Sequence, residues 1–212
     1  MFSNSFTYIG VDPTAGQKPM AFAALDDDMR LLALSQGDLD EVLAFAAGQR
    51  QAFIAISAPR RPNLGLMDQE ETRSQLVPAP RPGRWNNFRV AEYQLRQFGI
   101  TIPQTVATAS DCPNWVQTGF QLFQRLEKFG YQPFFTSGAE RQTLEVYPHA
   151  CFTAWMGMLP FPKHTLEGRL QRQLLLYERR LHLPDPLNFF EEITRHRLLQ
   201  GKLPEEILHT SA

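Results

Sequence analysis

The stretch Phe6-Thr-Tyr-Ile-Gly-Val-Asp12 decides the fold of this chain. It is a run of β-branched and aromatic residues that ends in a carboxylate, and Pro13 and Gly16 follow it. Because Pro and Gly interrupt regular structure, the run predicts a strand with Asp12 at its end. An acid at the end of a buried strand is costly unless it binds something. Asp12 is therefore a candidate metal ligand, and it is equally a candidate turn acid.

The residues that follow predict a mixed sheet. Residues 19–25 and 29–35 are apolar and are separated by three aspartates, which favours an antiparallel three-stranded meander. Residues 38–47 then have the capping acids and the apolar spacing of a helix, and residues 51–57 are a buried strand. A helix between two strands is a crossover, so this strand is expected to run parallel to the first. Ser57 would then lie beside Asp12, at the sheet edge where ligands collect.

A second acid comes at the end of a later strand-like run. Glu145 lies in the β-rich stretch 143–147, and Pro148 suits the first turn of a helix. We expect a helical C-terminal part from about residue 148. His149, at its start, is a candidate for orienting a carboxylate, although a histidine at a helix start commonly bonds to the backbone.

Residues 59–87 predict a long irregular connection. The segment holds five prolines and five arginines, which makes it either a substrate flap or a solvated loop. A helix is expected from Arg89 to Phe98, ended by Gly99. Arg89, Glu92 and Arg96 would lie on one side of this helix. They could form a surface salt-bridge ladder or contact a substrate.

The composition is that of a globular protein with one domain spanning residues 1–212. The chain is 43% hydrophobic and 20% charged, and it contains no apolar run near the roughly 18 residues of a membrane helix. The start lacks the pattern of a secretory signal, and Cys112 and Cys151 lack zinc spacing. We therefore expect a cytoplasmic protein with reduced cysteines and no membrane partner. The formal charge is uneven, −4 over residues 1–58 and +3 over residues 59–212, which suits a phosphate-bearing ligand or an ordinary mixed surface.

Five features in order resemble one protein family. They are Gly10-Val11-Asp12, Ala58-Pro59, Arg89 with Glu92, the run Glu145-Val-Tyr-Pro-His-Ala150, and Lys163-His-Thr-Leu-Glu-Gly-Arg169 with Arg172. Together they resemble the uncharacterised family DUF429, described as predicted nucleases of RNase H-like fold. The resemblance covers about residues 6–180.

The resemblance implies an α/β fold with an RNase H-like mixed sheet, flanked by helices, and a metal-dependent nuclease or phosphodiesterase acting on DNA or RNA. In that class two Mg²⁺ or Mn²⁺ ions clamp the attacking water and the leaving oxygen. Asp12 and Glu145 would be the metal ligands and catalytic acids. The other polar positions that match the family would contact substrate or phosphate: Arg89, Glu92, Lys163, Arg169 and Arg172.

Two departures from the family pattern open alternatives. The family usually has Asp-Ala-Pro where this chain has Ser57-Ala58-Pro59, and the terminal helix with its Asp-Ala signature is not found before Ala212. The second hypothesis is therefore a catalytically silent RNase H-like module that binds nucleic acid or a protein. A third is a phosphotransferase related to sugar kinases and actin-like ATPases, which ranks lowest because a single glycine, Gly16, follows the first strand closely.

Overall fold

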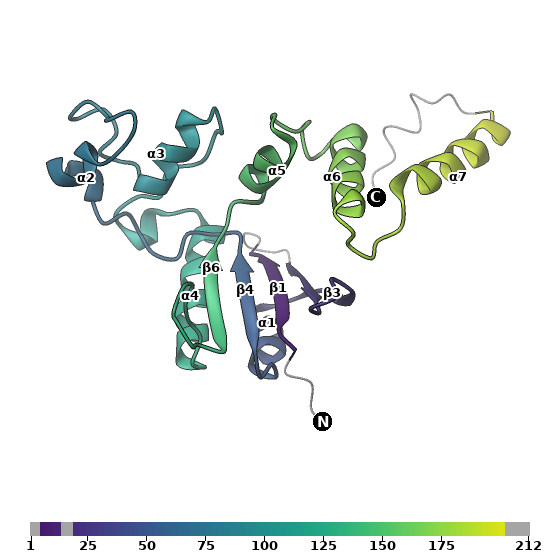
Figure 1. Cartoon of the computed structure of the whole chain (residues 1–212), viewed down its shortest axis with the longest axis horizontal. Coiled ribbons are helices and arrows are strands. Elements are labelled where there is room, and N and C mark those ends of the chain that lie inside the picture. The colour runs from purple at the N-terminus through teal and green to yellow at the C-terminus, as the bar shows by residue number, and fades with distance from the viewer. Residues whose placement is uncertain (1–4, 14–18, 202–212) are drawn as a thin grey trace. The chain divides into compact units, whose positions relative to one another are not determined.

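A computed structural model describes residues 5–13 and 19–201 of the chain (Figure 1). The side chains of residues 189, 190, 193 and 197 lie outside the description. The strands are β1 (Thr7–Asp12), β2 (Met20–Leu25), β3 (Leu31–Gly37), β4 (Ala52–Ile56), β5 (Gln132–Pro133) and β6 (Arg141–Glu145). The α-helices are α1 (Leu39–Ala47), α2 (Glu70–Ser74), α3 (Val90–Gln97), α4 (Asn114–Lys128), α5 (Pro148–Met156), α6 (Leu166–Glu178) and α7 (Pro186–Leu199), and two short 3₁₀ helices are η1 (Leu66–Asp68) and η2 (Ala109–Asp111).

The strands form one mixed sheet in the order β3-β2-β1-β4-β6-β5. β1 pairs antiparallel with β2 and parallel with β4, while β6 pairs parallel with both β4 and β5. This confirms the predicted α/β sheet of antiparallel and parallel strands flanked by helices, which is consistent with an RNase H-like arrangement.

Helix α1 makes the predicted crossover between β3 and β4. Its first turn is closed by a reciprocal cap: the Asp38 carboxylate accepts from the Glu41 N–H at 2.9 Å, and the Glu41 carboxylate accepts from the Asp38 N–H at 2.8 Å. Gly48 ends the helix. Local sequence alone was enough to place this element.

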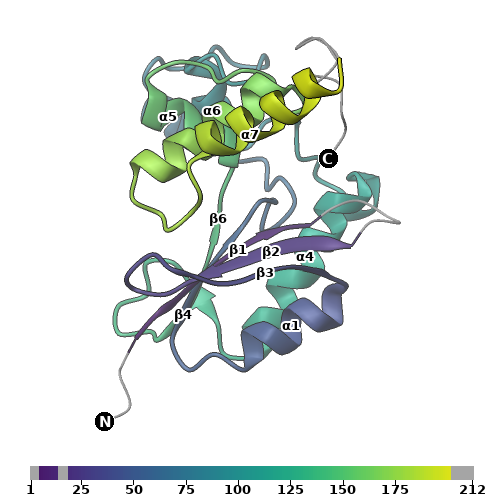
Figure 2. The same ribbon diagram turned by 90° about the vertical axis from the view of Figure 1, so that its right-hand side faces the viewer.

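One face of the sheet packs against α1 and α4, which lie on the same side of it (Figures 1 and 2). Side chains alternate between faces along a strand, so every second residue of β1 and β4 enters this core. The buried residues that meet here are Ile9, Val11, Ala52, Ile54 and Ile56 from the sheet, Val42, Leu43 and Ala46 from α1, and Leu122, Phe123 and Leu126 from α4. Apolar residues at helical spacing predict an amphipathic helix over residues 114–129, and the structure confirms it as α4.

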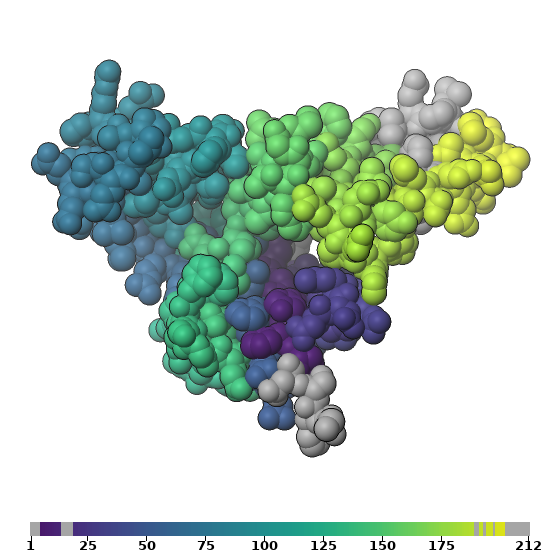
Figure 3. Space-filling view, viewed as in Figure 1, coloured from purple at the N-terminus to yellow at the C-terminus, as the bar shows by residue number. Residues whose placement is uncertain are grey.

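The connection over residues 59–87 packs around a small core of its own with α3. It contains η1 and α2, and its Met67 and Leu76 are buried with Tyr93 of α3. The Tyr93 hydroxyl donates to the Pro78 carbonyl at 2.5 Å. Figure 3 shows the side chains of this segment and of α3, in blue and teal, gathered into one mass. The solvated-loop interpretation of this segment is therefore not supported.

The described chain divides into two compact units. Among the described residues, the first unit holds the sheet, α1 to α4 and the chain up to residue 150, and the second holds residues 28–31 and 151–201. In the second unit the Thr165 hydroxyl caps α6 by accepting from the Gly168 N–H at 3.1 Å, as its sequence predicts. Within the described ranges, no helix is both long enough and apolar enough to span a membrane.

Candidate site at the carboxyl ends of the parallel strands

The three central parallel strands end together at one edge of the sheet. Val11 pairs with Ile56, and Ile56 pairs with Glu145. The ladder continues past the strands, since the Ser57 N–H donates to the Val11 carbonyl and the Val146 N–H donates to the Ile56 carbonyl, both at 2.9 Å. Both predicted acids therefore lie at the edge where ligands of such sheets bind.

Asp12 and Glu145 nevertheless project from opposite faces of the sheet. Glu145 is in register with Ile56 and through it with Val11, and both of these side chains enter the core beneath α1 and α4. Asp12 is one residue beyond Val11, so its side chain points away from that core. Asp12 is exposed there. The shared edge thus holds one acid on each face.

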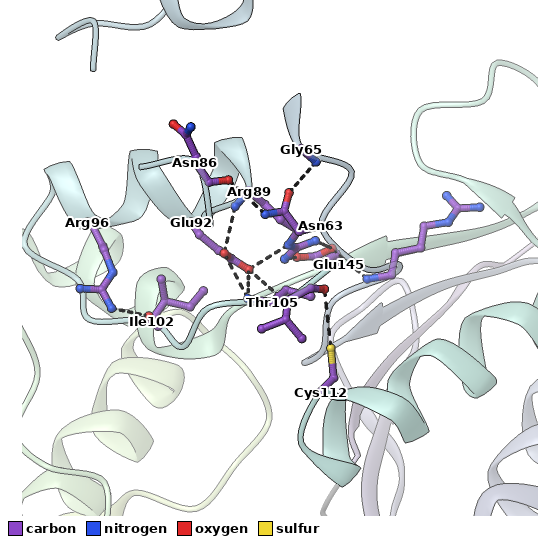
Figure 4. Close-up of polar contacts among 12 residues, drawn as sticks. Asn63, Gly65, Asn86, Arg89, Glu92, Arg96, Ile102, Thr105, Cys112 and Glu145 are labelled. Carbon is purple, nitrogen blue, oxygen red and sulfur yellow. Dashed lines mark hydrogen bonds and ion pairs between the residues drawn. The ribbon is translucent and has the colours of Figure 1, made fainter. Parts of the chain in front are cut away.

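The Glu145 carboxylate is held by the Arg89 side chain (Figure 4) and by one backbone N–H. Arg89 Nη1 donates to Oε2 at 2.8 Å, and Arg89 Nη2 donates to Oε1, so the guanidinium binds the carboxylate in a bidentate way. The Arg60 backbone N–H also donates to Oε2, at 3.0 Å. Paired donation from a planar guanidinium is the strongest geometry for such a contact. The Glu145 side chain is 31% exposed.

Glu92 completes the network from inside the protein, where its side chain is 1% exposed. It accepts from Arg89 Nε at 2.9 Å and from the Arg89 N–H at 3.0 Å, which caps the start of α3. It also accepts from the Thr105 hydroxyl at 2.5 Å and from the Thr105 N–H at 3.2 Å. The Arg89–Glu92 ion pair of the predicted ladder therefore forms, but it is not a surface ladder, because Glu92 is buried. Arg96 does not join it and donates to the Ile102 carbonyl at 2.8 Å.

The two carboxylates beside Arg89 stabilise the charged form of its guanidinium. Burial lowers the pKa of the Arg89 guanidinium, but its hydrogen bonds and ion pairs with Glu145 and Glu92 outweigh burial, and the pKa lies above its ordinary value. Arg89 therefore stays charged, with its donors already directed at two carboxylates. A phosphate could reach it only by replacing one of these pairs.

Arg60 and Thr105 are site residues that sequence reasoning missed. The Arg60 side chain pairs with Glu127 of α4 at 2.5 Å and lies over the Phe123 ring, 5.9 Å from its centre. Thr105 is buried against Glu92, 13 positions away in the chain. No local pattern links these positions, because the contacts depend on how α3 and α4 pack near the sheet edge.

A small cavity adjoins this network in the first unit. It is lined by the ends of β4 and β6, by Thr105 and by Trp115 of α4, and Ser57 is on its wall with Arg89. Its volume is about 30 Å³, which is room for about two water molecules. The cavity therefore accommodates water or a small ion, not a nucleotide.

The remaining predicted residues are described within their own units. Lys163, Arg169 and Arg172 belong to the second unit, where Arg172 Nη1 donates to the carbonyls of Phe161 at 2.9 Å and Gly168 at 2.7 Å. Lys163 and Arg169 are exposed. In the first unit, His149 is half-buried with its ring edge-on to Tyr147, 6.1 Å between centres.

The residues at this edge do not fit a metal pair shared by Asp12 and Glu145. Glu145 already bonds to two arginines, Asp12 is on the other face, and position 57 offers only a hydroxyl. Across residues 5–13 and 19–201, no three His, Cys, Asp or Glu side chains cluster as metal ligands would. The Mg²⁺ or Mn²⁺ site stays a prediction. Both cysteines are free, and burial raises the pKa of the Cys112 and Cys151 thiols, which disfavours a reactive thiolate.

The connection over residues 59–87 also carries arginines that are exposed to solvent. Of its five arginines, Arg60 is paired with Glu127, and Arg73 donates to the Met67 carbonyl at 2.9 Å. The other three are exposed: Arg61, Arg81 and Arg84. Arg84 lies over the Trp85 ring at 5.5 Å, and none of these three has an ion pair within the described part of the chain.

Fold and site together define an α/β protein with a mixed sheet whose carboxyl edge carries an internal arginine–glutamate network. The chain belongs to the family described as protein of unknown function, DUF429, whose model matches residues 10–203. No curated protein matches the chain.

Proposed function

We propose that this chain binds nucleic acid through exposed arginines of the connection that follows β4, without a bound metal. The observation that carries the proposal is the division of those arginines into two groups. Arg60 and Arg73 are used inside the protein, whereas Arg61, Arg81 and Arg84 are left to the surface. Guanidinium groups that lack an internal acid are suited to contact phosphates.

Local charge supports the same proposal although the whole chain is nearly neutral. Residues 59–98 contain seven arginines and four acids. One of those acids, Glu92, is buried and already neutralised by Arg89. That pair removes one charge of each sign, so the segment keeps a formal net charge of +3 (seven arginines minus four acids). A basic segment of this kind attracts a polyanion in a salt-dependent way.

The state of Glu145 argues for binding in preference to cleavage. Both Glu145 oxygens accept from the Arg89 guanidinium, so a metal ion at Glu145 would lie beside that positive charge and would compete with it for the carboxylate. Breaking a fully buried ion pair costs about 3–5 kcal/mol, and at this partly exposed pair the cost that a metal would have to offset is smaller. In this arrangement Glu145 acts as a counter-ion that positions Arg89.

Metal-dependent phosphodiester cleavage is the second candidate function. What favours it is Asp12, an exposed acid at the carboxyl end of β1 on the face away from the core. If it held Mg²⁺ or Mn²⁺, the ion would supply an activated water for hydrolysis. Glu145 would not share that ion without leaving Arg89.

The proposal is tested by measuring affinity for fluorescein-labelled DNA and RNA in EDTA over a range of salt concentrations. A variant with Arg61→Gln, Arg81→Gln and Arg84→Gln should bind about tenfold more weakly at moderate salt. The slope of log affinity against log salt should fall by about 2 to 3, because three phosphate contacts are lost.

The control has the same change in net charge on other elements: Arg30→Gln, Lys128→Gln and Arg195→Gln, all exposed. It should keep the affinity and slope of the unaltered protein. Equal weakening in both variants would mean that total charge, not this surface, governs binding. Absence of any binding in EDTA would overturn the proposal.

A further inference from the structure

The two edges of the sheet differ in how they are protected against pairing with another strand. β5, at one edge, spans two residues and includes Pro133, and short strands and prolines both hinder such pairing. β3, at the other edge, spans seven residues without a proline or a charged side chain (Figure 1). An edge strand of this kind is a template for a further strand.

The outer side of β3 has no strand beside it within the described ranges. β3 pairs with β2 on its inner side and ends the strand order. Across residues 5–13 and 19–201, no backbone hydrogen bond joins residues 32–36 to a segment beyond the sheet. These five residues belong to the first unit. The N–H and C=O groups along their outer side can therefore pair with a partner strand.

Two leucines on this edge strand are exposed. Ala33 packs against the core beneath α1 and α4, so Leu32 and Leu34 lie on the opposite face of the sheet. Leu34 is 73% exposed and Leu32 is 57% exposed. Leucines exposed together on an unprotected edge indicate an interaction surface.

We infer that β3 pairs antiparallel with β3 of a second copy of this chain, so that the sheet continues across a two-fold axis at Leu34. In that register Leu34 of one copy is opposite Leu34 of the other, and Leu32 is opposite Gln36. Because the strand carries no charged side chain, the pairing brings no like charges together along it. This inference is independent of the proposed function.

The residues that flank β3 in the chain favour a second copy as the partner. Arg30 and Asp38 are each four positions from Leu34, one before it and one after it. The pairing therefore sets Arg30 of each copy opposite Asp38 of the other, and both residues are exposed. Arg30 also lies 3.6 Å from the Asp28 carboxylate, and Asp38 caps α1, so each would add this contact to one that it already makes.

The two neighbouring registers fit less well. A centre at Ala33 would set Asp28 opposite Asp38 of the other copy, which places like charges together. A centre at Ser35 would set Leu32 opposite Asp38, which places an apolar side chain against an acid. The register centred on Leu34 avoids both contacts.

Sedimentation equilibrium of the full chain tests the association. The unaltered protein should form a dimer. Leu34→Lys places two lysines beside each other at the axis and should raise the dissociation constant of the dimer roughly tenfold or more. Leu64→Lys is the matched control, because Leu64 is 63% exposed and lies on the connection over residues 59–87. It should leave the dissociation constant unchanged.

Two results of this experiment would overturn the inference. One is a dimer whose dissociation constant is the same in Leu34→Lys as in the unaltered protein. The other is an unaltered protein that stays monomeric at every concentration measured, which would leave the edge of β3 to a strand of another protein.

Cysteine cross-linking tests the register and does not depend on how well Leu34→Lys folds. Cys151 is exposed, so the variants are made together with Cys151→Ser. Leu34→Cys should form an intermolecular disulfide on mild oxidation, because directly opposed residues have Cβ atoms about 4.5–5.5 Å apart. Leu32→Cys is the control, since its two copies would lie about 13 Å apart along the strands, too far for a disulfide. Cross-linking of Leu32→Cys as fast as Leu34→Cys, or of neither variant, would overturn this pairing.

Discussion

Glu92 is the residue on which the edge of the sheet depends most. Its carboxylate accepts from Arg89 and from Thr105, which joins the start of α3 to the chain that leads toward α4. A buried carboxylate is costly unless donors surround it, and here four donor atoms do. Arg89 then extends the network outward to Glu145.

We expect Glu92→Gln to lower the free energy of unfolding by about 2–4 kcal/mol. The neutral amide removes the negative charge that pairs with Arg89, and its NH₂ group would face a hydrogen-bond donor where a carboxylate oxygen now accepts. Urea denaturation measures the change. Glu70→Gln, on the exposed side of α2, is the control and should stay within about 0.5 kcal/mol of the unaltered protein. A Glu92→Gln variant as stable as this control would show that the buried network contributes no stability.

The sequence singled out Arg89, Glu92 and Glu145, but not their roles. Their positions matched a family pattern, while spacing along α3 predicted a surface ladder. Burial of Glu92 depends on Thr105 and on the packing of residues 59–87 against α3, which are contacts between distant parts of the chain. Spacing within one helix carries no information about such contacts.

At the scale of elements, α4 approaches the end of β4 unusually closely at Gly119. A Cβ built at this position would lie 2.4 Å from the Cβ of Ala58, which is too short for two carbon atoms. Glycine in a helix interior is otherwise unfavourable by about 1 kcal/mol relative to alanine. The close approach is the reason that glycine is needed here.

Gly119→Ala should therefore destabilise the protein by about 1–2 kcal/mol, although alanine favours the helix. Gln121→Ala, on the exposed side of α4, should be neutral or slightly stabilising. Adding Ala58→Gly to Gly119→Ala should restore more stability than the two changes predict separately, since it removes the clashing atom. Thermal unfolding of Gly119→Ala, Gln121→Ala, Ala58→Gly and the double variant measures these changes. A stabilised Gly119→Ala would contradict the close packing at this contact.

Elements with local signals were predicted well, and those without them were not. β1, α1 and β4 follow from strand-forming runs, the Asp38 cap and Gly48. The connection over residues 59–87 has no periodicity, because its small core forms from scattered residues such as Met67 and Leu76 against α3. Only the folded chain brings these residues together.

At the scale of the whole molecule, strand register decides which chemistry the sheet edge supports. The sequence placed Asp12 and Glu145 at strand ends, and the structure confirms both positions. Their faces could not be predicted, since a shift of one residue in register reverses the face of every side chain. With Glu145 toward the core and Asp12 away from it, the two acids do not face one shared metal position.

The most direct test of this account is the affinity of the unaltered protein and of Asp12→Asn for labelled single-stranded DNA, measured in EDTA and again with Mn²⁺. If exposed arginines bind the strand without a metal, we expect both proteins to bind with equal affinity in EDTA. Adding Mn²⁺ should neither change that affinity nor cause strand cleavage. Binding that requires Mn²⁺ and is lost in Asp12→Asn would contradict this expectation and would point to a metal site at Asp12. Cleavage with the same dependence would point to metal-dependent catalysis there.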